Sequence, residues 1–263
     1  MSVSLKSLVD DTNQYLGIDQ IKDYCPNGLQ VEGRAQVSSI LGGVTASQAL
    51  IDKALETGAD AILVHHGFFW KGEDACITGI KRKRLKVLLE NNISLLAYHL
   101  PLDMHSEVGN NVQLAARLGI EITGPLDIDA AQSIGLVGQL SKPVSAVEFK
   151  ALVDRVLGRE CLHIGYQKMA HPEQDAANQQ IKTIGWCTGG AQGMIELAVA
   201  RGVDAYLSGE ISEPTVHIAR ETGTHYFAAG HHATERYGVQ ALGNKLAAKF
   251  DLDFQFLDID NPV

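Results

Sequence analysis

The sequence has few cysteines, a shortage of positive charge and no long apolar run. Its four cysteines, Cys25, Cys76, Cys161 and Cys187, show no CxxC spacing, so they predict neither a disulfide framework nor a structural zinc site. Only 22 lysines and arginines stand against 31 acids, which gives a net charge of −9. This charge argues against a general nucleic-acid binder, because such affinity comes largely from cations that neutralise phosphates. We expect reduced thiols that do not bind metal.

Targeting and membrane segments are not evident either. The N-terminus, MSVSLKSLVDDTNQYLG, carries acids and lacks the continuous apolar segment of a signal peptide. No apolar stretch approaches the length needed to cross a bilayer. We therefore expect a cytoplasmic protein without a membrane partner. With 263 residues, 45% of them apolar and 20% charged, the chain is long enough for one large or two small globular domains.

One dense basic run, Lys81-Arg82-Lys83-Arg84 with Lys86, departs from the acidic composition. It fits the solvated face of a helix. It also fits a contact with an anionic ligand, and both interpretations stay open.

Segment 61–67, which reads AILVHHG, is the most informative stretch of the chain. Its four apolar residues show no alternation, which suits a strand buried on both faces of a parallel sheet. In a regular strand His65 and His66 point to opposite faces, so both reach one site only if the backbone curls there, as Gly67 permits. Ligand sites in open α/β sheets lie just past the carboxyl ends of strands, where this pair is predicted.

Strands and helices alternate along most of the chain. Apolar periodicity, caps and turn residues predict helices over 5–16, 48–57, 80–90, 112–118, 146–157, 194–201, from Pro214 onward and over 232–250. The same signals predict strands over 29–31, 37–44, 61–64, 93–98, 133–140, 181–187, 205–208, 226–229 and 252–259, and a loop over 170–180. This alternation indicates an α/β fold with largely parallel sheets.

An internal repeat relates two halves of the chain. Residues 54–67, ALETGADAILVHHG, align with 198–211, AVARGVDAYLSGEI, at an offset of 204 − 60 = 144. Further on, ISLLAYHLPLD aligns with THYFAAGHHATE at an offset of 231 − 99 = 132. We therefore predict two α/β halves, residues 1–124 and 125–263, around one site.

Both halves place a histidine and, four residues later, a carboxylate after the equivalent strand. These pairs are His99 with Asp103, and His231 with Glu235. Imidazole and carboxylate are the ligands of hydrolytic Zn²⁺, Mn²⁺ or Fe²⁺ sites, and residues at i and i+4 share one face of a helix. Together with the histidine pair at 65 and 66, these residues predict a metal cluster. His99 is either a direct ligand or a hydrogen-bond partner of Asp103 or of water.

Other polar residues have weaker signals. Glu210 ends the strand equivalent to the one that carries His65, so it is either a general acid or base or a capping or surface residue. Residues 188–193, TGGAQG, form either an anion-binding turn or a plain tight turn. His232 is expected to point away from the cluster. The remaining histidines are assigned to the surface or to packing: His105, His163, His171, His217 and His225.

The segments GADAILVHHGFFW, AYHLPLD, CTGGAQ, DAYLSGE and AAGHHATERYG resemble the GTP cyclohydrolase type 2 homolog family, also called the Nif-three-like family. The resemblance covers nearly the whole chain. It implies two interlocked α/β domains, two divalent metal ions and a hexameric ring built as a trimer of dimers. It assigns His65 and His231 to one ion and His66 and Asp103 to the other, with Glu235 as the bridge. Longer relatives insert a further domain, and this chain has only the short segment 125–180 there.

These observations predict a dinuclear metal-dependent hydrolase. Two ions about 3.5–4 Å apart would lower the pKa of a water shared between them toward neutrality, and that water is then a nucleophile at pH 7. The resemblance suggests GTP as the small-molecule substrate, with opening of its imidazole ring and release of formate. Glu210 and His99 are the candidate catalytic residues. Two alternatives remain, a metal-dependent phosphoesterase and a non-catalytic ring protein whose metals are structural or regulatory.

Overall fold

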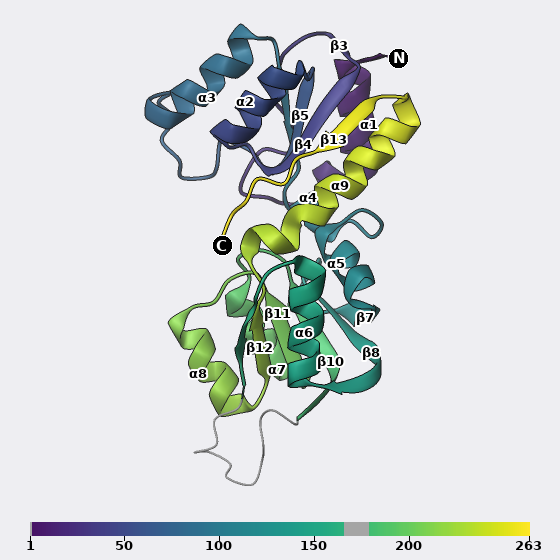
Figure 1. Ribbon diagram of the computed structural model, residues 1–263, viewed down its shortest axis with the longest axis vertical. Coiled ribbons are helices and arrows are strands. Elements are labelled where there is room, and N and C mark those ends of the chain that lie inside the picture. The colour runs from purple at the N-terminus through teal and green to yellow at the C-terminus, as the bar shows by residue number, and fades with distance from the viewer. Residues whose placement is uncertain (1, 166–178) are drawn as a thin grey trace. The chain divides into compact units, whose positions relative to one another are not determined.

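The computed structural model describes residues 2–165 and 179–263, which form two compact units (Figure 1). Unit 1 contains Met1–Gly109 and Arg236–Asp260, and unit 2 contains Asn110–Glu235 and Asn261–Val263. This division differs from the expected boundary after residue 124. The C-terminal segment belongs to unit 1 because its strand β13 (Asp253–Phe256) pairs in parallel with β4 (Ser39–Thr45). The long helix α9 (His231–Phe250) contributes its first turn to unit 2 and the rest to unit 1.

Unit 1 is built on a sheet in the order β13-β4-β5-β6-β2, in which β2 alone is antiparallel to its neighbour. Its other elements are β1 (Val3–Ser4), α1 (Leu5–Leu16), η1 (Ile18–Gln20), β2 (Gly28–Val31), β3 (Gln36–Val37), α2 (Gln48–Thr57), β5 (Ala61–His66), α3 (Gly79–Glu90), β6 (Ser94–Ala97) and α4 (Leu100–Met104). The predicted caps of α2 are confirmed, since the Ser47 side chain accepts from Leu50 N–H and Gly58 ends the helix in the left-handed conformation.

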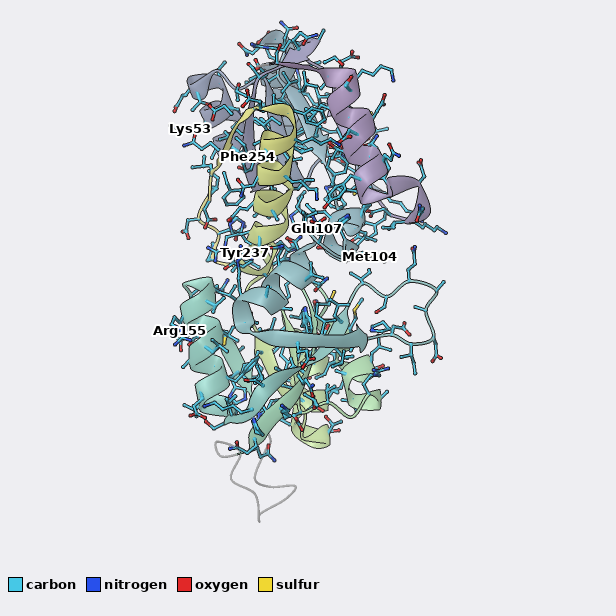
Figure 2. All side chains as sticks on the ribbon, turned by 90° about the vertical axis from the view of Figure 1, so that its right-hand side faces the viewer. Lys53, Met104, Glu107, Arg155, Tyr237 and Phe254 are labelled. Carbon is cyan, nitrogen blue, oxygen red and sulfur yellow. The ribbon has the colours of Figure 1, made fainter. Side chains whose placement is uncertain are left out.

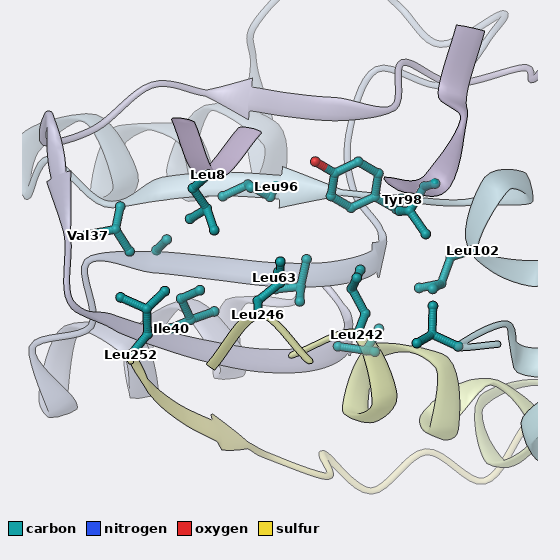
Figure 3. Packing of buried hydrophobic residues seen from close by; sticks show 14 of the residues in the cluster. Leu8, Val37, Ile40, Leu63, Leu96, Tyr98, Leu102, Leu242, Leu246 and Leu252 are labelled. Carbon is teal, nitrogen blue, oxygen red and sulfur yellow. The ribbon is translucent and has the colours of Figure 1, made fainter. Parts of the chain in front are cut away.

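The central strands of unit 1 are buried on both faces, as the apolar run predicted. Leu63 and Leu96 pack with α1 and α9, among them Leu8 and Leu246 (Figure 3). Ile62 and its neighbours on the opposite face pack with α2 and α3. Because side chains alternate along a strand, His65 lies on the same face of β5 as Leu63, and His66 lies on the same face as Ile62.

The α9 helix is also tied to unit 1 by polar contacts. Glu107, labelled beside α9 in Figure 2, accepts from Lys245 Nζ at 2.8 Å and from the Tyr15 hydroxyl at 2.6 Å. The Lys245 ammonium also lies 4.4 Å from the centre of the Tyr15 ring. Glu107 is exposed and Lys245 and Tyr15 are half-buried, so this network adds little stability compared with the apolar core.

Unit 2 is built on a mixed sheet in the order β7-β8-β10-β11-β12-β9. Its parallel pairs are β10 with β11 and β11 with β12, while the pairs made by β7, β8 and β9 are antiparallel. The elements of unit 2 besides the start of α9 are α5 (Asn110–Leu118), β7 (Ile120–Pro125), β8 (Leu136–Ser145), α6 (Ala146–Leu157), β9 (Leu162–Ile164), β10 (Gln180–Cys187), η2 (Gln192–Met194), α7 (Ile195–Ala200), β11 (Ala205–Ser208), α8 (Glu213–Thr222) and β12 (His225–Ala228). The capping box predicted at Ser145 and Glu148 is present.

The repeat is visible in the hydrogen bonds of both units. Oδ2 of Asp60 accepts from two consecutive backbone N–H groups at the start of β4, at 2.7 and 3.0 Å. Oδ2 of Asp204 accepts from two consecutive N–H groups of β10 in the same way, at 2.9 and 2.8 Å. The strands that follow, β6 and β12, correspond as well, because Ala97 pairs with Val64 and Ala228 pairs with the equivalent residue Ser208. The offset between Ala97 and Ala228 is 228 − 97 = 131. One more residue therefore separates strand from histidine in unit 2 than in unit 1.

Several predicted elements differ from the observed ones. The strand predicted over 133–140 begins and ends later, as β8, and the strand predicted over 252–259 is shorter, as β13. The elements that were not predicted from the sequence include β1, β7, β9 and the short helix α4. Most of the loop predicted over 170–180, together with His171, lies outside the described residues. Within the described ranges, no helix is both long and apolar enough to span a membrane.

Candidate metal centre

Three imidazoles gather at the carboxyl ends of two neighbouring strands of unit 1. β5 ends with His65 and His66, and β6 is followed by His99, the N-cap residue of α4. The two strands are parallel partners, so these ends lie at the same edge of the sheet. One ring nitrogen from each residue lies within 4.8 Å of the others. The structure thus brings together three histidines that the sequence predicted at the ends of two different strands.

The sequence predicted that the backbone curls at the histidine pair. This prediction is wrong, because β5 extends through both residues. His66 still pairs with Thr45 of β4, and the ring centroids of His65 and His66 are 4.6 Å apart. Gly67 is not in the left-handed region. A Cβ there would lie 2.2 Å from Oε1 of Gln30, so glycine is needed for close packing rather than for a turn.

Backbone and carboxylate groups orient the His65 ring. Its Nδ1 lies 2.9 Å from the carbonyl oxygen of Tyr98, and a carbonyl only accepts, so Nδ1 carries the proton. The lone pair of neutral His65 is then on Nε2, which lies 3.5 Å from Oδ1 of Asp103. Two electron-pair donors therefore face each other, an arrangement that favours a cation between them.

His99 is paired with Asp23, which the sequence analysis did not identify. The Nδ1 of His99 lies 3.0 Å from Oδ1 of Asp23. Burial opposes ionisation of Asp23, but hydrogen bonds from His99 and Asn27 and from the Leu100 N–H outweigh it and lower its pKa. Asp23 is therefore an acceptor at neutral pH, and Nδ1 of His99 is the donor. The expected partner of His99 was Asp103 or water, so the carboxylate that orients it comes from elsewhere in the chain.

Cys25 lies in the same neighbourhood. Its sulfur, a carboxylate oxygen of Asp23 and a ring nitrogen of His99 lie within 4.8 Å of one another. Burial, together with the charge of Asp23, raises the pKa of the Cys25 thiol to about 12. The thiol is therefore protonated at neutral pH when no metal is bound to it.

Unit 2 contributes the second histidine and carboxylate pair. His231 and Glu235 lie on the first turn of α9, with Nε2 of His231 3.2 Å from Oε2 of Glu235. The other ring nitrogen, Nδ1, lies 2.7 Å from Oε1 of Glu210. Burial opposes the charge of His231, but the two carboxylates outweigh it and raise its pKa to about 9. This part of unit 2 therefore stabilises positive charge.

Glycines make room for this pair. A Cβ on Gly189 would lie 2.0 Å from Oε1 of Glu235 and 3.1 Å from Nε2 of His231, and φ of Gly189 is +68°. Gly209 occupies the repeat position of His65, and a Cβ there would lie 2.6 Å from the Cα atom of His231. Close packing in unit 2 thus excludes the histidine that unit 1 carries at the same position.

Three backbone N–H groups of the loop 188–193 donate hydrogen bonds to acceptors within unit 2. The N–H of Thr188 donates to Asn111, that of Gly189 to Thr234, and that of Ala191 to Ser208. These three groups are therefore engaged by protein acceptors. This pattern favours the tight-turn interpretation over an anion site at those groups.

The remaining histidines lie elsewhere. His105 and His225 are packed within their units, and His217 is exposed on α8 with its Nε2 2.8 Å from Glu213. His163 stacks on the ring of Phe227 at 4.6 Å. Among the described residues, His232 belongs to no candidate ligand group.

The basic run lies on α3, where its members differ in their surroundings. Nζ of Lys81 lies 3.3 Å from Oε2 of Glu73 and 4.9 Å from the centre of the Phe69 ring. Lys86 pairs with Glu90 along the helix at 3.5 Å. Lys81 thus supports the loop after β5, while the exposed members of the run form a solvated helix face.

The chain matches a known protein family over almost its whole length. The family described as Duf34/NIF3 (NGG1p interacting factor 3) matches residues 3–262. The chain belongs to this family. This DUF34/NIF3 member is 56% identical to a Pseudomonas aeruginosa protein named GTP cyclohydrolase 1 type 2 homolog, over 100% of both chains. The resemblance inferred from the motifs is confirmed.

Solved structures show the same fold. A structure titled "protein ybgI, unknown function" is 48% identical, with a TM-score of 0.92, and the match covers 99% of this chain and 100% of that one. TTHA1606 from Thermus thermophilus is 32% identical, with a TM-score of 0.85 and the same coverage. The α/β fold of this DUF34/NIF3 member is therefore shared along its full length.

Proposed function

We propose that this DUF34/NIF3 member is a hydrolase that depends on two divalent metal ions, Zn²⁺, Fe²⁺ or Mn²⁺. His65 and His231 are assigned to one ion, His66 and Asp103 to the other, and Glu235 to both. The chemistry of the donors supports this assignment, because imidazole and carboxylate are the usual ligands of such ions. Bound there, the ions would supply an activated water and stabilise negative charge in the transition state.

The observation that carries the proposal is that, in each unit, one histidine assigned to metal has its second ring nitrogen held by an oxygen. Nδ1 of His65 donates to the Tyr98 carbonyl at 2.9 Å, and Nδ1 of His231 lies 2.7 Å from Oε1 of Glu210. Histidines at metal sites commonly donate their second nitrogen to a carboxylate or a backbone carbonyl, which fixes the tautomer and the ring orientation. Both units therefore contain features typical of a built metal site.

The candidate catalytic residues take different roles in this proposal. Glu210 is a positioning residue, because its carboxylate is committed to His231 and acts through that ring. The Nε2 of His99 is turned by Asp23 toward the Tyr24 hydroxyl, at 3.5 Å. We assign His99 to proton transfer or to water positioning at the reacting group.

GTP is the proposed substrate, on the strength of the family resemblance and of the name carried by the P. aeruginosa relative. The test follows formate and phosphate released from GTP by protein reconstituted separately with Zn²⁺, Mn²⁺ and Fe²⁺. Glu235→Ala is the blank. Glu213→Ala, whose side chain is 79% exposed on α8, is the matched control.

Metal-dependent formate release that is absent from Glu235→Ala supports ring opening. Release of phosphate alone identifies a phosphoesterase. If no product appears with any ion, the hydrolase proposal is wrong and a non-catalytic metal-binding role becomes the better explanation.

We also propose a hexamer built as a trimer of dimers, and a cytoplasmic location. The family resemblance supports the first, and the absence of any disulfide among the four cysteines, all of which lie in the described part of the chain, is consistent with the second. Light scattering coupled to size exclusion tests the assembly, since a hexamer has six times the 28.4 kDa mass of the chain.

A further inference from the structure

Two partly exposed aromatic side chains border the imidazoles of unit 1. The Tyr24 side chain is 52% exposed, and its ring centroid lies 5.7 Å from that of Trp70. The His99 ring lies 5.0 Å from each of them, edge to face in both cases. The His66 ring lies 5.9 Å from Trp70. Aromatic surface is therefore presented to solvent directly beside the ring nitrogens.

The loop that carries Trp70 has a strained backbone. Phe69 has φ of 66°, a left-handed conformation that is rare for a bulky side chain and costs on the order of 1–3 kcal/mol. The loop is held by Phe68 N–H, which donates to Gln30 at 2.6 Å, and by Trp70 N–H, which donates to Glu73 at 3.1 Å. These contacts fix the conformation that leaves the Trp70 side chain partly exposed.

The two aromatic residues also belong to segments that are tied to each other. Lys71 N–H donates to the carbonyl oxygen of Tyr24 at 2.8 Å. The Tyr24 hydroxyl lies 3.5 Å from Nε2 of His99. The spacing between the two rings is thus set by the backbone as well as by ring packing. Strain and partial exposure of large rings beside polar groups are typical of a ligand surface rather than of a core.

We propose that Tyr24 and Trp70 form a stacking platform for a planar heteroaromatic ring, such as a purine base, in the substrate. The proposal rests on the hydrolase function proposed above and names the chemical class of its substrate. A ring stacked on this platform lies beside His66 and His99, which border the same surface. Stacking recognises any planar π system, while the His99 imidazole provides a hydrogen-bonding group at its edge.

The two tryptophans of the chain allow a direct binding assay. Trp186 is 1% exposed and lies in unit 2, where its Nε1 donates to the Asn111 carbonyl. Trp186→Phe therefore leaves Trp70 as the only tryptophan. Zn²⁺-loaded Trp186→Phe protein is titrated with guanosine, adenosine, cytidine and GTP while tryptophan fluorescence is followed. Ribose 5-phosphate and inorganic triphosphate are the non-planar probes.

We expect saturable quenching by nucleosides and GTP, and none by the non-planar probes. By calorimetry, Trp70→Ala should bind the nucleosides about 5- to 150-fold more weakly, whereas Trp70→Phe should keep most of the affinity. Circular dichroism and denaturant unfolding establish that each variant is folded, and Trp70→Phe serves if Trp70→Ala does not fold. Equal quenching by ribose 5-phosphate, no binding of any nucleoside, or unchanged affinity in folded Trp70→Ala would overturn the platform.

The two proposals fail in different ways. GTP turnover by Trp70→Ala with an unchanged KM removes the platform and leaves the hydrolase intact. Saturable nucleoside quenching without turnover by any metal form keeps the platform and counts against the hydrolase.

Discussion

Asp23 holds His99 by a hydrogen bond of 3.0 Å between Oδ1 and Nδ1, across 76 residues of sequence. The same carboxylate accepts from Asn27 and from the Leu100 N–H, both at 2.9 Å. A carboxylate held in this way fixes the tautomer of the imidazole, so that the lone pair of neutral His99 is on Nε2. The orientation of His99 therefore depends on a residue outside the His-x-x-x-Asp motif.

Asp23→Asn should lower the turnover of GTP by the metal-loaded protein roughly 10- to 100-fold, because an amide neither supplies the negative charge nor enforces the tautomer of His99. Product release measures the activity, and competition with a chromogenic chelator should show unchanged metal affinity. Asp19→Asn, an exposed acid of the neighbouring turn, is the control and should match the parent protein. If folded Asp23→Asn turns over GTP as fast as the parent, Asp23 does not position a catalytic histidine.

Gly189→Ala should release metal, because the added Cβ would lie 2.0 Å from Oε1 of Glu235. The left-handed backbone at this residue adds a cost of roughly 1–2 kcal/mol for any side chain. Gly193→Ala is the matched control from the same loop, since no atom lies within 4 Å of its Cβ position. We expect elemental analysis to show metal loss in Gly189→Ala only. Equal metal content in the two folded variants would mean that Glu235 does not depend on this close approach.

Asp60→Ala should destabilise unit 1 by about 2–4 kcal/mol, since it removes an acceptor for buried N–H groups and for Arg34 Nη1. Asp204→Ala should have a comparable effect on unit 2, because Asp204 makes the equivalent bonds. Urea unfolding measures both losses. Asp52→Ala, an exposed acid on α2, should change stability by less than about 0.5 kcal/mol. An effect of Asp60→Ala as small as that of Asp52→Ala would contradict this role of Asp60 as a hydrogen-bond acceptor.

Acid should destabilise unit 2 through His163 and His225, whose Nε2 and Nδ1 lie 3.0 Å apart. Burial lowers the pKa of His163 to about 4, with the charges of His225 and Lys150 acting in the same direction. Burial also lowers the pKa of His225, against the charge of Asp204. The unfolded chain takes up these protons first, near pH 6.5. Stability is therefore present above that pH and is lost as pH falls toward 4.

The loss expected from His163 between pH 7 and pH 5 is of the order of 1–2 kcal/mol. Trp186 fluorescence during urea unfolding, in a Trp70→Phe background, reports on unit 2. His163→Gln should flatten the pH dependence, while His217→Gln, with a side chain 58% exposed, should leave it unchanged. An identical slope for His163→Gln and the parent would show that the pair does not titrate in this range.

The parts of the fold that were predictable from sequence are those set by local signals. Ser47 and Gly58 delimit α2 because a cap and a left-handed glycine act within one turn. The strand β5 was recognisable because both of its faces are buried. β9 and α4 are short, and their positions depend on pairing and on capping by residues distant in sequence, so no local pattern marks them.

The candidate site was predictable where its residues follow strands or repeat between the halves. His65, His66 and the two His-x-x-x-acid pairs carry those signals. Asp23 does not, because it lies in a loop without a periodic pattern and reaches His99 only through the tertiary fold. The role of Gly189 could not be predicted from the sequence either, since the close approach of the Glu235 carboxylate depends on packing within unit 2.

The most direct test of a dinuclear centre is the metal content of the purified chain after reconstitution with Zn²⁺ or Mn²⁺. The parent protein and His217→Ala should each retain two ions per chain, whereas His66→Ala in unit 1 and Glu235→Ala in unit 2 should each lose metal while remaining folded. Full retention of metal in both His66→Ala and Glu235→Ala, or no bound metal in the parent protein, would contradict it.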